Sequence, residues 1–190
     1  MCAPAGSGGY QLDLPVYALL KGQSYLAECG AKGWHPSDPI ALVEWFSSAV
    51  SNHGEQLRRL VRYVKAWAEF QSWQYGVMPG GLLLTVLTVQ NYYRNDRDDI
   101  SMAMTFQAIE SHTCPLRHIL NPVDSGDDLT ARMSILQFAH FQEAVAKAAS
   151  DAAQAVQCSS IGHASDLWRK QFGDRFPAAR SSCSLRLTDL

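Results

Sequence analysis

The sequence lacks the residue patterns of several common sites. It has five cysteines, but no two of them form a C-x-x-C pair, and none of its six histidines lies in an H-x-x-x-H or H-E-x-x-H pattern. These spacings are typical of structural zinc sites and zinc proteases, so the sequence predicts neither. An odd number of scattered cysteines also argues against a disulfide framework and favours reduced thiols in the cytoplasm.

Long apolar runs and a strong net charge are missing as well. The longest apolar run, GLLLTVLTV at residues 81–89, is too short to cross a bilayer, and the N-terminus has no basic stretch followed by an apolar one. A formal net charge of -2 gives no general attraction to nucleic acid or to anionic lipid. We therefore expect a cytoplasmic protein with no membrane partner and no specific nucleic-acid partner.

The residues that are present predict a core built mainly from helices. Hydrophobic residues make up 47% of the chain, enough for one compact domain or slightly more. Apolar periodicity predicts helices over residues 37–52, 54–73, 99–112, 127–158 and 164–172. The apolar run at 81–89 predicts a buried element, for which length favours a helix although its β-branched residues leave a strand open.

The N-terminal part predicts only one strand. Residues 10–17 are rich in β-favouring side chains, with Pro15 suited to a strand end or a sheet edge. Residues 19–35 predict irregular chain with a helical turn around SYLAE, and residues 113–126 predict loops around a short RHIL segment. A lone strand leaves its backbone donors and acceptors without a partner strand. We therefore infer that part of a sheet is missing from this sequence.

The helix predicted over 54–73 carries a basic stripe. Arg58, Arg62 and Lys65 lie at i, i+4 and i+7, so they share one face of that helix. The opposite face is apolar and consists of Leu57, Leu60, Val61, Val64, Trp67 and Ala68. Most stripes of this kind are solvated surfaces, and the alternative is a surface that binds an anion.

Six short motifs follow one another in a distinctive order. They are LDLPVY at 12–17, GWHPSDPIALVEWF at 33–46, LRRLVRYVKAWAEF at 57–70, MPGGLLLTVL at 78–87, NPVDSGDDLT at 121–130 and ASDLWRKQFGDRFP at 164–177. In this order they resemble the second part of the bacterial cGAS/DncV-like nucleotidyltransferases. Members of that family make cyclic di- or oligonucleotide signals from nucleoside triphosphates in anti-phage defence.

The resemblance implies a mainly α fold, the helical lobe of an oligoadenylate-synthase-like nucleotidyltransferase. One or two N-terminal strands would be left from the α/β catalytic core. Residues 1–20 would then be the remnant of that core, residues 21–178 the helical lobe and residues 179–190 a tail.

The resemblance also implies roles for individual residues. Family members hold two Mg²⁺ ions with a D-x-D and a third carboxylate from the neighbouring strand, and Asp13 matches that third position as a catalytic metal ligand. Lys65 matches a lysine that contacts the triphosphate, and Arg62 lies one turn earlier on the helix. Gly80 stands where the family often has a serine that touches the triphosphate, so here only a backbone amide is left for that contact.

The catalytic core motifs of the family are not in this sequence. Gly6 and Ser7 are not followed by a D-x-D, because the position two after Asp13 is Pro15. Asp96 and Asp98 do form a D-x-D, but they lie within RNDRDD, which we interpret as a solvated, charged turn.

Three hypotheses follow from these observations. The first is a part of a synthase that is inactive alone and acts with a catalytic lobe in cis or in trans, with Mg²⁺ and with ATP, GTP or other nucleoside triphosphates. The second is a non-catalytic helical module that binds a nucleotide or a protein. The third is a helical protein whose matches are ordinary core tryptophans and prolines at helix boundaries.

Overall fold

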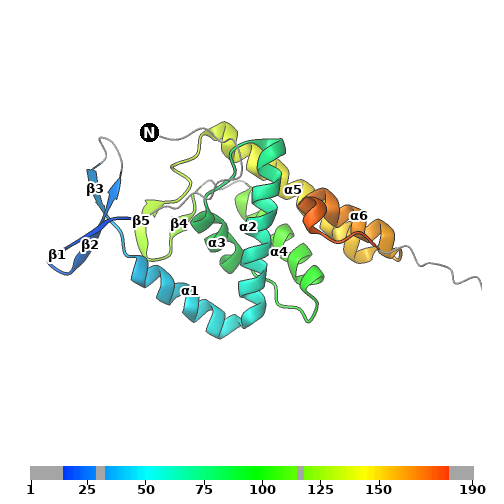
Figure 1. The fold of residues 1–190 in the computed structure, drawn as a ribbon, viewed down its shortest axis with the longest axis horizontal. Helices are drawn as coiled ribbons and strands as arrows, with labels where there is room; N and C mark the ends of the chain where they lie inside the picture. The colour runs from blue at the N-terminus through cyan, green and yellow to red at the C-terminus, as the bar shows by residue number, and fades with distance from the viewer. Residues whose placement is uncertain (1–14, 29–32, 115–117, 180–190) are drawn as a thin grey trace, which may run out of the picture. The chain divides into compact units, whose positions relative to one another are not determined.

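The computed structural model describes residues 15–28, 33–114 and 118–179 (Figure 1). The chain divides into two compact units, Met1–Glu44 and Trp45–Leu190. Asp13 and most of the strand predicted over residues 10–17 lie outside the described residues.

The first unit contains a small antiparallel sheet. Strands β1 (Tyr17–Leu20), β2 (Gln23–Glu28) and β3 (Gly33–Pro36) pair in the order β1-β2-β3. Lys21 and Gly22 both have positive φ, 51° and 82°, as a two-residue hairpin turn of type I′ requires. The helical turn predicted around SYLAE is therefore wrong, because this hairpin places the segment between two partner strands.

Helix α1 (Pro39–His53) crosses the boundary between the two units. The Asp38 carboxylate accepts a hydrogen bond from the Ala41 amide at 2.9 Å, which satisfies one of the free donors of the first turn. Pro39 occupies the first helical position, where its missing amide hydrogen is not needed. The predicted start of this helix is confirmed.

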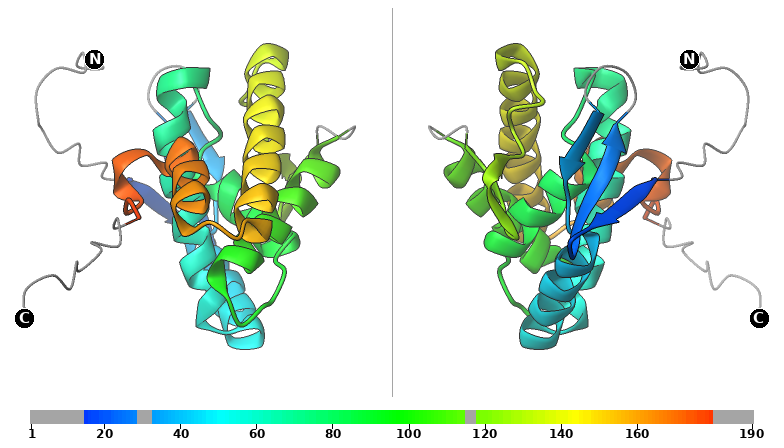
Figure 2. Two further views of the ribbon diagram at one scale, coloured as in Figure 1. Left: turned by 90° about the vertical axis from the view of Figure 1, so that its right-hand side faces the viewer. Right: turned by 90° about the vertical axis from the view of Figure 1, so that its left-hand side faces the viewer.

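The second unit is a bundle of helices, which confirms the mainly α prediction. It contains α2 (Glu55–Tyr75), α3 (Gly81–Gln90), α4 (Asp98–Thr113), α5 (Ile135–Gln157), α6 (Ile161–Phe172) and the short 3₁₀ helix η1 (Gly173–Arg175). Helix α4 packs along α5, and α3 packs along α2. Helix α6 packs against both α5 and α2, and the left view of Figure 2 shows it in orange beside the yellow α5.

The region before α5 differs from the prediction. Strands β4 (Leu120–Asn121) and β5 (Asp124–Asp128) form a hairpin where loops were expected, and α5 begins eight residues later than predicted, at residue 135 rather than 127. The Asp128 carboxylate accepts hydrogen bonds from the Thr130 amide and hydroxyl, which fixes a turn in place of helix. Ser134 then starts α5 through a capping box with Gln137.

Trp67 lies at the centre of the core and is fully buried. Its ring contacts Phe106 of α4 edge-on at a centroid distance of 5.0 Å and Phe141 of α5 at 6.3 Å. Its indole Nε1–H donates to the Gln171 side chain of α6 at 3.1 Å. All six residues of the predicted apolar stripe on α2 are buried, so that prediction is confirmed.

Among the described segments, no helix is both long enough and apolar enough to span a lipid bilayer.

Gly173, which ends α6, gives a direct test of how tightly η1 is packed against α2. Its φ is +64°, and a Cβ built on it would lie 2.3 Å from the Phe70 ring. We expect Gly173→Ala to lower the free energy of unfolding by about 2 kcal/mol, since the new methyl group adds both steric overlap and backbone strain. Urea unfolding followed by circular dichroism measures this change.

Gly162→Ala is the matched control within α6. A Cβ there meets only the Ser160 hydroxyl at 3.8 Å, and alanine favours helix. This variant should be neutral or slightly stabilising. Equal unfolding free energies for the two variants would contradict the close packing of Gly173 on Phe70.

Candidate functional site

Lys65 lies against the first turn of α3. A Cβ built on Gly81 would be 3.6 Å from both Nζ and Cε of Lys65, so the ammonium group lies beside the start of this helix. Gly80 and Gly81 are exposed, and no atom of the described residues lies within 4 Å of a Cβ built on Gly80. The fold therefore brings Lys65 of α2 together with the MPGG motif.

The start of α3 presents backbone donors that no described side chain caps. Gly80 is the N-cap residue in an extended conformation, and it has no side chain to accept from the first amides. The first intrahelical bond runs from the Leu84 amide to the Gly80 carbonyl, at 3.2 Å. The amides of residues 81–83 thus precede the hydrogen-bonded ladder, where the helix dipole also favours negative charge.

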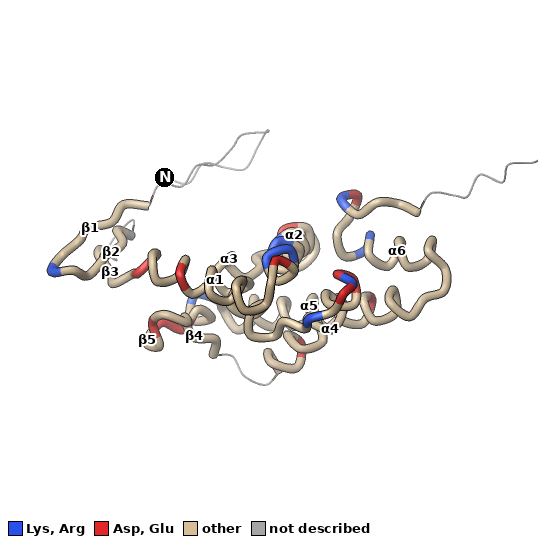
Figure 3. The backbone as a smooth tube through the Cα atoms, turned by 90° about the horizontal axis from the view of Figure 1, so that it is seen from below, with Lys and Arg blue, Asp and Glu red and all other residues tan. Residues whose placement is uncertain are grey.

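Lys and Arg positions of α2 are drawn in blue in Figure 3. The three cations of the basic stripe differ in their partners. Arg58 pairs with Glu55 at 3.0 Å and lies over the Phe46 ring at 5.8 Å. Arg62 and Lys65 are exposed and make no ion pair with any described residue. Cations without a partner among the described residues, set beside the amides of a helix start, are groups that bind phosphate in many proteins.

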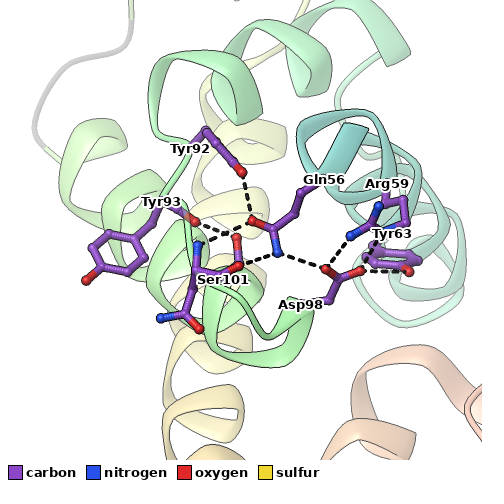
Figure 4. A network of polar contacts seen from close by, with 8 residues as sticks. Gln56, Arg59, Tyr63, Tyr92, Tyr93, Asp98 and Ser101 are labelled. Carbon is purple, nitrogen blue, oxygen red and sulfur yellow. Dashed lines mark hydrogen bonds and ion pairs between the residues drawn. The ribbon is translucent and has the colours of Figure 1, made fainter. Parts of the chain in front are cut away.

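A polar network beside this face fixes α2 to the start of α4 (Figure 4). The Asp98 carboxylate accepts two hydrogen bonds from Arg59, at 2.7 and 2.8 Å, and one each from Gln56 and Tyr63. The Gln56 side chain also binds the Tyr92 hydroxyl at 2.7 Å and the backbone of Asn95. Asp98 is therefore a structural residue that joins two helices.

This network corrects the interpretation of the RNDRDD segment as a solvated turn. Asp96 is exposed, but Asp98 is partly buried and has every carboxylate oxygen engaged. The Arg59 guanidinium holds the pKa of Asp98 down, to about 2, although burial opposes this shift. Asp98 is thus a stably ionised partner of Arg59, and this D-x-D is not arranged as a metal site.

The described part of the chain contains no group of three or more His, Cys, Asp or Glu side chains that could hold a metal ion. The one carboxylate matched to a metal ligand of the family, Asp13, lies outside the described residues. The described residues alone therefore do not fit a two-metal centre.

Comparison with known proteins gives a consistent set of relatives, although no protein-family model matches the sequence. A cyclic GMP-AMP synthase of Escherichia albertii is 27% identical over 133 residues, which are 68% of this chain and 29% of that protein. A cyclic AMP-AMP-AMP synthase of an Acinetobacter species is 24% identical over 190 residues, which are 95% of this chain and 55% of that protein. The chain is related to the cGAS/DncV-like nucleotidyltransferases.

Solved structures of this family share the fold. Vibrio cholerae DncV in its 3'-deoxy ATP bound form has a TM-score of 0.71 at 22% identity, over 85% of this chain and 45% of that one. Escherichia coli DncV in its 3'-deoxy GTP bound form has a TM-score of 0.69 at 22% identity, over 85% and 46%. The chain thus spans about half the length of the DncV chains that it matches.

The sequence alone led to part of this site. Lys65 and Gly80 were named for a role in the cGAS/DncV-like family, and the structure brings their two helices together. Arg62 lies on the same helix face as Lys65 and is exposed. Gly81 was missed as a neighbour of the ammonium group, and Asp98 was missed as the anchor of α4. Neither contact has a sequence signal, because both join segments more than 15 residues apart.

The Asp98 network predicts how stability depends on pH. Because the pKa of Asp98 is lower in the folded protein than its usual 3.8, folding is favoured fully above about pH 4 and loses this contribution as the pH falls towards 2. The loss amounts to about 1–2 kcal/mol after allowance for partial exposure. Urea unfolding at pH 5 and pH 2.5 measures it.

Asp98→Asn separates this effect from that of Asp128. Burial alone would raise the pKa of Asp128, but hydrogen bonds from Thr130 and His118 lower it to about 2. Asp98 and Asp128 therefore titrate in the same pH range. The Asn variant should be less stable at pH 5 and lose less stability on acidification than the unmodified protein. An unchanged pH dependence in this variant would show that Asp98 does not supply the linkage.

Proposed function

We propose that this chain supplies the helical, triphosphate-binding part of a nucleotidyltransferase that makes cyclic di- or oligonucleotides, and that it serves anti-phage defence. The observation that carries the proposal is the contact between the Lys65 ammonium and the uncapped first turn of α3. Its relatives support the choice of ligand, since they include cyclic GMP-AMP and cyclic AMP-AMP-AMP synthases. DncV structures that share its fold hold ATP and GTP.

The chemistry of a nucleoside triphosphate suits this arrangement. Its oxygens carry several negative charges that one cation cannot neutralise, and they also accept hydrogen bonds. Lys65 supplies a charge with three rotatable donors, and the amides of residues 81–83 supply fixed donors. Glycine at positions 80 and 81 leaves the backbone open to close approach by the phosphates. Arg62, one turn earlier on α2, is the second cation proposed for this anion.

Catalysis requires groups that lie elsewhere. Mg²⁺ in a complete enzyme would neutralise the triphosphate and stabilise the attacking and leaving oxygens, and Asp13 is the single proposed ligand in this chain. One carboxylate does not hold two metal ions, so the reaction depends on a catalytic lobe with the remaining ligands, in cis or in trans. No catalytic step is assigned to the described residues.

Binding of ATP to the isolated chain tests the nucleotide site. Isothermal titration should detect ATP and inorganic tripolyphosphate competing for one site. Lys65→Ala should weaken ATP binding about tenfold or more, because it removes the charge-assisted contact, and Arg62→Ala should weaken it about threefold.

Lys147→Ala is the control, since Lys147 is an exposed lysine on a different helix, α5. It should leave the affinity for ATP unchanged. If Lys65→Ala and Lys147→Ala bind ATP equally well, the triphosphate does not bind at the start of α3.

A second candidate function is a nucleotide-binding module without chemistry. It is favoured by one observation: the described residues bring Lys65 to the start of α3 but contain no metal-ligand set. Incubation of the purified chain with Mg²⁺, ATP and GTP should yield no linear or cyclic dinucleotide under either proposal. Product formation by the chain alone would overturn both.

The two proposals differ in what a catalytic lobe adds. A separately expressed lobe with the Gly-Ser and D-x-D motifs should restore synthesis only if the chain is part of a synthase, and Lys65→Ala should then lower the rate. ATP binding in the micromolar range with no restored synthesis would instead support the module.

A further inference from the structure

A cavity of about 410 Å³ lies on a different side of α2 from Lys65. It is lined by residues of α2, α4 and α6 and by the segment around η1, all within the second unit. Tyr63 and Ala66 of α2 line it, whereas Lys65 faces the start of α3. Its volume is within the range of small-molecule sites in proteins.

One wall of the cavity is aromatic. Trp168 and Phe176 stack at a centroid distance of 6.0 Å and an angle of 24°, and Phe172 lies 6.0 Å from the first ring and 6.4 Å from the second. All three line the cavity, together with Tyr63 and the Met102 side chain. Aromatic faces carry negative partial charge, so this wall attracts both apolar groups and cations.

Two carboxylates at the start of α4, Asp98 and Asp99, also line the cavity. Asp98 is fully engaged by Arg59, Gln56 and Tyr63. Among the described side chains, only Arg97 donates to Asp99, and 62% of the Arg97 side chain is exposed. An exposed ion pair of this kind is weak, so Asp99 can exchange Arg97 for a ligand.

Arg175, the one cation among the described residues that line the cavity, is already paired. Arg175 donates two hydrogen bonds to Glu69, at 2.9 and 3.1 Å. An anionic ligand would have to displace Glu69 and would also lie near two carboxylates. The cavity therefore favours positive over negative ligands.

We propose that this cavity binds a small organic cation, an ammonium group that carries an aromatic or branched apolar substituent. The ammonium group lies between the aromatic wall and Asp99, and the substituent fills the apolar remainder. Cation–π attraction and the carboxylate act on the same charge, while burial of the substituent adds the hydrophobic contribution. This site is independent of the triphosphate site proposed above.

The expected affinity is modest. The α4 N-terminus and Arg97 already balance part of the charge of Asp99, so the carboxylate adds only a small increment. A dissociation constant in the millimolar range for a minimal probe is the expected result, as for small fragments in apolar pockets.

Three probes of similar size but different charge test the proposal. Benzyltrimethylammonium is the cation, benzyl alcohol the neutral compound and benzenesulfonate the anion. Each probe is titrated into the full chain while the NMR signal of the Trp168 indole is recorded. A Trp168→Phe sample assigns that signal. The cation should bind with the highest affinity. Equal or tighter binding of benzenesulfonate, or no shift with any probe, would overturn the proposal.

Two substitutions of the ion pair should have opposite effects on benzyltrimethylammonium. Asp99→Asn should weaken its binding about threefold, because the carboxylate charge is lost. Arg97→Gln should tighten its binding about threefold, because Asp99 is freed from its partner. Arg132→Gln, an exposed arginine before α5, is the control that should leave it unchanged. Changes of the same sign for Asp99→Asn and Arg97→Gln would overturn the role of Asp99.

Phe176→Leu separates the cation–π contribution from simple apolar contact. Leucine keeps most of the apolar surface but removes the aromatic face, so binding of benzyltrimethylammonium should fall by more than binding of benzyl alcohol. An equal loss for both probes would show that the aromatic wall acts only as an apolar surface and would overturn the proposed selectivity for cations.

Discussion

Burial of Trp67 is the constraint on which the helical unit depends. Its ring meets aromatic side chains of α4 and α5, and its indole hydrogen bonds to Gln171 of α6. A buried indole N–H without an acceptor would be costly, and Gln171 is itself held by Asp151 at 2.6 Å. The Trp67 side chain of α2 therefore contacts α4, α5 and α6 at one point. These contacts require the apolar stripe of α2 to pack against the other three helices.

The position of α2 then determines every surface to which we assign a function. Because successive residues point in different directions around a helix, one side of α2 packs in the core, another presents Lys65 to α3, and a third presents Tyr63 and Ala66 to the cavity. Asp98 adds a second connection, since it binds Arg59 and Tyr63 of α2 from the first turn of α4. The proposed anion site and the cavity are thus built on one helix.

This arrangement explains which sequence interpretations succeeded and which failed. Helices α1 and α2 have long apolar stripes and, in α1, a clear cap, so their positions follow from local chemistry. The segments around SYLAE and NPVDSGDD lack such a stripe, and their strands form only because partner strands are available. The predicted start of α5 is wrong because an alanine-rich pattern does not indicate where the first turn begins. The capping box of Ser134 sets that position.

The sequence by itself determined the mainly helical fold, the apolar stripe of α2, the basic stripe beside it and the family resemblance that singled out Lys65, Arg62 and Gly80. These features depend on the spacing of residues within a single helix or motif, which can be read directly from the sequence. Only the tertiary structure decided that the Lys65 ammonium lies at the start of α3, that Asp98 is a structural ion-pair partner, and that aromatic residues of α6 enclose a cavity with the acids of α4. Each of those contacts joins separate helices, and the packing around Trp67 sets the distances between them.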